Sequence, residues 1–113
     1  MTRYLISFDD GAMAHIPDGD WPAVGAAAHA VVRQAKEAGV WIHGGGVRQQ
    51  RASIVATDGR VSEGPSPETK AVIGGFSIIQ VPSREDAIEW AAKIAVACRC
   101  AQEVRELMDD PEV

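Results

Sequence analysis

Apolar and polar residues alternate at the start of the chain, which is typical of a β-strand with one buried face. Over residues 3–8, Tyr4, Ile6 and Phe8 fall on one side of the strand. The same reasoning predicts five further strands, at 40–43, 52–57, 60–62, 74–81 and 101–107. Asp58-Gly59 predicts a tight hairpin turn between the third and fourth of these six strands.

Two other segments repeat their apolar residues every three to four positions, which indicates amphipathic helices. The first helix is expected to begin near Asp20 as N-cap, with Pro22 in its first turn and Gly39 just past its end. Its apolar stripe is Val24, Ala28, Val31, Ala35 and Ala38. The second helix is expected to follow Ser83 as N-cap, with Asp86 three residues later in the capping-box position.

This order of elements, β-α-β, a hairpin and β-α-β, predicts an α+β fold. We expect a ferredoxin-like βαββαβ arrangement with an extra β-hairpin. Residues 1–113 are expected to form a single domain, and 108–113 to form a frayed acidic tail. Both helices should cover one face of an antiparallel sheet, so the other face must meet water or a partner.

The parity of the second strand predicts what lies on that other face. If Val40 and Ile42 face the helices, Trp41 and His43 face away from them. Since an exposed Trp on an uncovered face is unfavourable, we expect a homodimer that buries this face and leaves a sheet-side cavity for a small-molecule ligand. The alternative is that Trp41 packs under the hairpin.

Charge and cysteine content narrow the classes of function. The 113 residues carry a net charge of −5, which argues against nucleic-acid binding, because that needs a basic stripe. No apolar run approaches the roughly 20 residues of a membrane span, and the N-terminus lacks a signal-peptide core, so a cytoplasmic location is expected.

Cys98 and Cys100 are expected to be free thiols. The two cysteines could supply two metal ligands, but the sequence has no second pair of ligands at the spacing of a metal site, so no metal is predicted. No cofactor is predicted either, because the sequence contains no cofactor-binding motif.

Several short segments after residue 39 occur in an order that is typical of one family. They include Gly44-Gly45-Gly46, the sequence Val-Ser-Glu-Gly-Pro-Ser-Pro-Glu-Thr-Lys at 61–70, Gly74-Gly75-Phe76, the Ala-Ile-Glu-Trp-Ala of 87–91 and Glu103-Val104-Arg105. Segment 61–70 resembles the motif Asp-Gly-Pro-Phe-Ala-Glu-x-Lys. In this ordered combination the chain resembles YCII-related proteins of the DGPF type.

The resemblance implies a dimeric α/β barrel and a bacterial, cytoplasmic homodimer. In the wider group, a His on or beside the first helix and a nearby acid form the proposed active site, and His29 is the matching residue here. The chain departs from the motif at three positions: the Asp, Phe and Ala of the motif are replaced here by Glu63, Ser66 and Pro67.

The candidate catalytic residues are His29, Glu63 and Glu68. His29 lies one position past the apolar stripe, where partial burial and a carboxylate neighbour can tune an imidazole near neutrality. Glu63 and Glu68 lie on either side of the Gly-Pro-Ser-Pro loop. The alternatives are that His29 merely packs at a boundary and that Glu68 pairs with Lys70 on the surface. The candidate substrate-binding residues are Trp41, His43, Ser66 and Lys70.

Two classes of function follow. In the first, the protein is a cofactor-free enzyme in which His29, aided by Glu63 or Glu68, moves a proton on a small organic substrate in a lyase or isomerase reaction. In the second, it is a non-catalytic ligand-binding or regulatory module, since DGPF-type proteins commonly accompany extracytoplasmic-function sigma factors.

Overall fold

The computed structural model of the protein describes residues 1–48, 52–64 and 73–113. The elements, in chain order, are β1 (Thr2–Asp9), a short 3-10 helix η1 (Asp18–Asp20), α1 (Trp21–Glu37), β2 (Trp41–Gly46), β3 (Ser53–Val55), β4 (Val61–Glu63), β5 (Ile73–Val81), α2 (Arg84–Cys98) and β6 (Glu103–Glu106). The predicted α+β class and the order of the elements are confirmed. None of the helices in these ranges is both long and apolar enough to cross a membrane.

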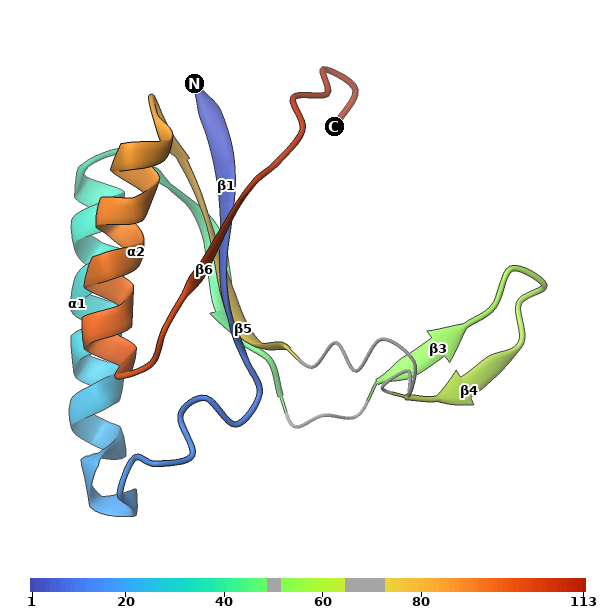
Figure 1. Ribbon diagram of the computed structural model, residues 1–113, viewed down its shortest axis with the longest axis horizontal. Coiled ribbons are helices and arrows are strands. Elements are labelled where there is room, and N and C mark those ends of the chain that lie inside the picture. Colours follow the sequence, from blue (N-terminus) through green and yellow to red (C-terminus); the bar gives the residue numbers. More distant parts are fainter. Residues whose placement is uncertain (49–51, 65–72) are drawn as a thin grey trace.

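The four longer strands form one antiparallel sheet in the order β2-β5-β1-β6. Both helices lie on the same face of this sheet, as Figure 1 shows, so the other face is left uncovered by helices. This is the predicted ferredoxin-like arrangement. The sheet of the described residues is open, with β2 and β6 at its edges. A barrel would therefore need a second copy of the chain, and the dimeric barrel stays a prediction.

The core lies between the sheet and α2. Tyr4 and Ile6 of β1, Ile79 and Val81 of β5 and the small residues Ala87 and Ala91 of α2 form one buried cluster. The alanines allow the helix to approach the sheet closely, so that the β-strand side chains fill the space between the two layers.

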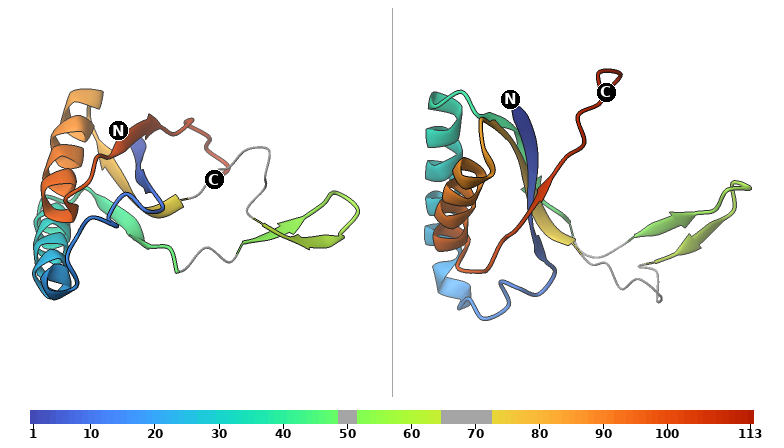
Figure 2. Two further views of the ribbon diagram at one scale, coloured as in Figure 1. Left: turned by 60° about the horizontal axis from the view of Figure 1, so that its bottom comes forward. Right: turned by 45° about the horizontal axis from the view of Figure 1, so that its top comes forward.

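The extra hairpin, β3 and β4, projects away from the helices and the main sheet (Figures 1 and 2). Its turn is the predicted one: Gly59 has a φ of 89°, and Asp58 accepts a hydrogen bond from the Arg60 backbone N–H at 3.0 Å. Val55 and Val61 pair across the hairpin and are 67% and 66% exposed. A two-stranded hairpin with such exposed apolar residues gains little stability of its own.

Strand β2 differs from its prediction in two ways. Gly44-Gly45-Gly46 does not end the strand, because each glycine pairs with a residue of β5. In addition, the register shifts between Trp41, which pairs with Ile79, and His43, which pairs with Ile78. This bulge places Trp41 and His43 on opposite faces, since an extra residue breaks the alternation.

The prediction that Trp41 lies on the uncovered face is therefore wrong. Trp41 shares the face of the buried Ile79 and packs against the core below the helices. His43 does lie on the uncovered face, and its ring contacts Phe76 there, with ring centroids 6.3 Å apart.

The two predicted helix caps also differ in outcome. Ser83 caps α2 as predicted, because its hydroxyl accepts a hydrogen bond from the Asp86 N–H at 3.2 Å. Asp20 is the N-cap residue of α1, as predicted, but its side chain makes no capping hydrogen bond. The preceding turn of 3-10 helix gives Asp20 a helical backbone, and its carboxylate instead accepts a hydrogen bond from Arg99 at 2.7 Å.

Candidate functional site

A cavity of about 470 Å³ lies where α1, the end of α2 and the edge strand β2 come together. Its walls are partly apolar, with Val32 from α1, Trp41 from β2 and Ile94 from α2. Its polar lining groups come from all three elements and from β5: His29, Lys36, His43, Ser77 and Cys98. The cavity thus combines an apolar surface with a few polar side chains, which is the usual composition of a small-molecule site.

His29 and Lys36 reach the cavity from the same side of α1. They are seven residues apart, which is two helical turns, so their side chains project in nearly the same direction. Both residues are exposed. An exposed imidazole at the mouth of a cavity can exchange protons with a bound molecule and with solvent.

The glycines of β2 shape the opposite wall. A side chain at Gly44 would lie 2.5 Å from the Phe76 carbonyl oxygen and 2.9 Å from Cη2 of Trp41. The indole of Trp41 therefore lies directly beside the bare backbone of Gly44. Gly44, Gly45 and Gly46 all line the cavity, so a ligand there meets backbone rather than side chains.

Cys98 contributes a thiol from the last residue of α2. Burial and, to a lesser extent, the neighbouring Cys100 raise the pKa of Cys98. The thiol therefore stays protonated at neutral pH, and it is a weak nucleophile there. Both cysteines are free.

The structure brings three of the predicted site residues together, because His29, Trp41 and His43 line the same cavity. Glu63 is the last residue of β4 and is exposed. It is not among the described residues that line the cavity, because the β3–β4 hairpin projects away from the helices (Figure 1). Ser66, Glu68 and Lys70 lie outside the described residues. Among the residues that are described, no carboxylate lines the cavity and no three metal-ligating side chains gather.

The polar lining residues Lys36, Ser77 and Cys98 were missed from the sequence. Lys36 could have been found, because a residue two turns after His29 must share its face of the helix. Cys98 could not have been found in this way, because its place in the cavity depends on how the end of α2 packs against α1 and β2.

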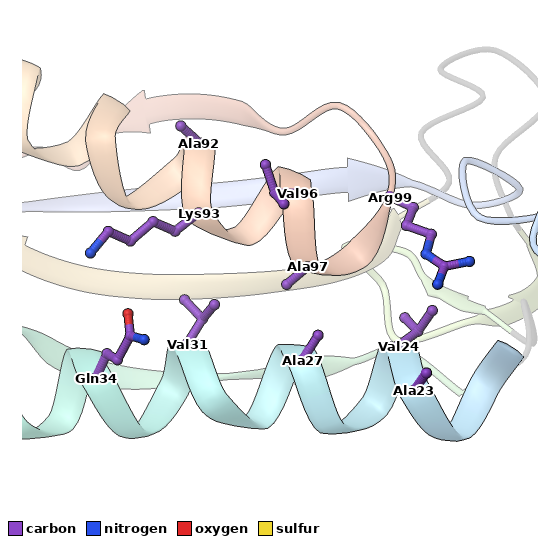
Figure 3. A pocket seen from close by; sticks show the side chains of 10 residues that line it. All are labelled: Ala23, Val24, Ala27, Val31, Gln34, Ala92, Lys93, Val96, Ala97 and Arg99. Carbon is purple, nitrogen blue, oxygen red and sulfur yellow. The ribbon is translucent and has the colours of Figure 1, made fainter.

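A second hollow, of about 630 Å³, runs between the two helices on the side away from the sheet (Figure 3). Figure 3 shows Ala27 and Val31 of α1 pointing toward α2, and Ala97 of α2 pointing toward α1. Its polar residues are Gln34, Lys93 and Arg99, and Arg99 is already paired with Asp20. Since none of the described residues that line this groove carries an imidazole or a carboxylate, it offers less acid–base chemistry than the cavity beside β2.

The comparisons with known proteins agree with this fold. The model of the YCII-related domain family matches residues 20–109. A similar solved structure is the 5-chloro-2-hydroxyhydroquinone dehydrochlorinase TftG from Burkholderia phenoliruptrix AC1100, in complex with 2,5-dihydroxybenzoquinone. The two are 15% identical, with a TM-score of 0.55 over 99% of this chain and 98% of that one. No curated protein matches the sequence.

Proposed function

The chain belongs to the YCII-related family, and from this premise we propose that it is a cofactor-free enzyme that moves a proton on a small organic substrate. The observation that carries the proposal is that His29 lines a cavity with an apolar wall formed by Trp41 and Ile94. A volume of about 470 Å³ suits a ring-sized molecule with room for water. Among similar folds, the dehydrochlorinase supports an elimination reaction on a ring.

In the proposed reaction, His29 acts as the general base. Its imidazole takes a proton from a carbon or hydroxyl of the substrate, the released electron pair forms a double bond, and a leaving group departs with its own pair from the next position. If no group leaves, the imidazolium returns the proton to a different atom and the product is an isomer. Both outcomes conserve atoms and electrons without an oxidant.

A carboxylate partner for His29 is the second part of the proposal. Because the hairpin projects away from its own helices, Glu63 would reach such a cavity from a second copy of the chain (Figure 2). We therefore propose a homodimer of the DGPF type, with Glu68 as a further candidate. A cytoplasmic location is proposed as well, because both cysteines are free thiols.

The test is turnover of 5-chloro-2-hydroxyhydroquinone and related ring substrates, measured by halide release and absorbance. His29→Gln is expected to lower kcat by a factor of about 10² to 10⁴, the usual contribution of a general base. His15→Gln is the matched control, since His15 is exposed in the loop after β1 and does not line the cavity. Unchanged turnover in His29→Gln would refute the assignment.

The alternative, a non-catalytic ligand-binding or regulatory module of a sigma-factor system, is favoured by one observation. No described carboxylate lines the cavity, so within the described chain His29 has no acid to orient it. If ring compounds bind but none is turned over by the wild-type protein, this alternative replaces the enzyme.

A further inference from the structure

We propose that the cavity selects organic anions and that Lys36 is the residue that recognises their charge. The inference rests on the proposed function for the location of the site and adds the chemical class of its ligand. Its ligand is a ring-sized molecule with one anionic oxygen, such as a carboxylate or a phenolate.

The first argument is the sign of the charge around the cavity. The chain has 16 acidic and 11 basic side chains. The cavity lining reverses this balance, because among the described residues that line it Lys36 is charged and there is no Asp or Glu. A concave surface lined by one sign of charge concentrates ligands of the opposite sign. In an acidic protein, such a cavity attracts cations less strongly than the rest of the surface does, and it attracts anions more strongly.

The second argument is that Lys36 is available for a ligand. The ion pairs among the described residues join Arg60 to Asp58, Arg99 to Asp20 and Arg105 to Glu103, and none of them uses Lys36. Lys36 lines the cavity and is exposed to solvent. A substrate oxyanion could therefore bind the Lys36 ammonium group without breaking an existing pair.

The third argument concerns the rest of the ligand. Trp41 and Ile94 offer an apolar surface for a ring. Trp41 belongs to β2, which is an edge strand, so one side of its backbone has no strand neighbour among the described residues. Gly45 and Gly46 leave that backbone uncovered, and its N–H groups can donate to a ligand oxygen. Charge recognition at Lys36 and ring contact at Trp41 together define the ligand class.

The experiment compares the binding of benzoate with that of its neutral isostere benzamide, by calorimetry and by shifts of the histidine NMR signals. Benzoate is expected to bind more tightly, and its affinity is expected to fall as NaCl rises to about 0.5 M, because salt screens an exposed charge pair. Lys36→Gln should weaken benzoate about fivefold to tenfold and leave benzamide unchanged. Lys36→Arg should keep most of the benzoate affinity.

Lys93→Gln is the matched control, because it removes the same charge from α2, where Lys93 lies over the Trp90 ring and outside the cavity. Equal binding of benzoate and benzamide, no benzoate binding, or equal losses in the two glutamine variants would overturn the proposal. The experiments distinguish failure of the proposed function from failure of the anion inference. Anion binding without turnover refutes the enzyme alone, and turnover that survives Lys36→Gln unchanged refutes the anion inference alone.

Discussion

Gly44 is the residue on which the shape of the cavity most depends. Its missing side chain leaves space for the Trp41 ring and for the Phe76 carbonyl oxygen, 2.5 Å from where a Cβ would stand. Gly44→Ala is therefore expected to lower the free energy of unfolding by about 1–3 kcal/mol, since backbone atoms cannot move aside easily. It should also weaken ligand binding, because the displaced indole enters the cavity.

Gly45→Ala is the control for this prediction, since nothing lies within 4 Å of a Cβ at Gly45. Its free energy of unfolding should stay within about 0.5 kcal/mol of the wild type. Urea denaturation of the two variants provides the measurement. Equal stabilities would show that the Trp41 ring and β5 adjust freely.

Tyr4 makes stability depend on pH in the alkaline range. Burial first, and the Glu106 carboxylate second, raise the pKa of Tyr4 above its ordinary value of 10.0. Its hydroxyl donates to Glu106 at 3.4 Å. Because the folded state holds this proton more tightly than the unfolded state, the stabilisation is fully present below pH 10 and is lost as the pH rises through the folded pKa.

Urea denaturation from about pH 8 to about pH 11 tests this dependence. In Tyr4→Phe, the decline in the free energy of unfolding above pH 10 should become shallower. Cys98→Ala is the comparison, because the raised pKa of Cys98 predicts a separate decline that begins near the ordinary thiol value of 9.0. An unchanged alkaline slope in Tyr4→Phe would contradict the prediction.

The N-termini of the two helices depend on different side chains. Ser83→Ala removes the hydroxyl that accepts from the Asp86 N–H, and it is expected to cost about 1 kcal/mol of stability. Asp20→Ala removes only an exposed ion pair to Arg99, whose loss is expected to cost less than about 0.5 kcal/mol. Thermal and urea denaturation of the two variants give the comparison, and a larger effect at Asp20 would reverse it.

The pattern along the chain predicts the elements because their periodicity is local. Alternation gives β1, and the spacing of apolar residues gives α1 and α2. The bulge between Trp41 and His43 arises from pairing with β5, more than 30 residues later, and no local pattern encodes it. The error over the face of Trp41 follows directly from this non-local feature.

In the candidate site as well, local sequence patterns identify some residues, and only tertiary packing brings the others to the cavity. His29 is recognisable by its position beside the apolar stripe, and Lys36 follows from helical geometry. The place of Cys98 requires tertiary packing. The resemblance and the place of Glu63 beside the Gly-Pro-Ser-Pro loop predict that Glu63 acts with His29, but the hairpin that carries Glu63 leads away from the cavity of the same chain (Figure 1).

The shape of the chain favours assembly with a second copy. Its radius of gyration of 15.7 Å exceeds the roughly 13 Å of a compact chain of this length, because the hairpin extends from the body. Leu5 and Ile78 pair on the sheet face that no helix covers. An apolar sheet face and an isolated hairpin both gain stability when a partner buries them.

The expected species in solution is a dimer of about 24 kDa, twice the 12.0 kDa of one chain. Ile78→Asp places a charge on the uncovered face and is expected to give folded monomers, measured by light scattering with circular dichroism as the check of folding. Leu5→Gln, a milder change on the same face, should weaken the dimer.

Val96→Asp is the matched control, since Val96 is 81% exposed on α2 and should leave the dimer intact. A wild-type monomer, or dissociation by Val96→Asp as well, would contradict dimerisation through the sheet face. Glu63 would then have no route to the cavity from another subunit, and His29 would have to act without it.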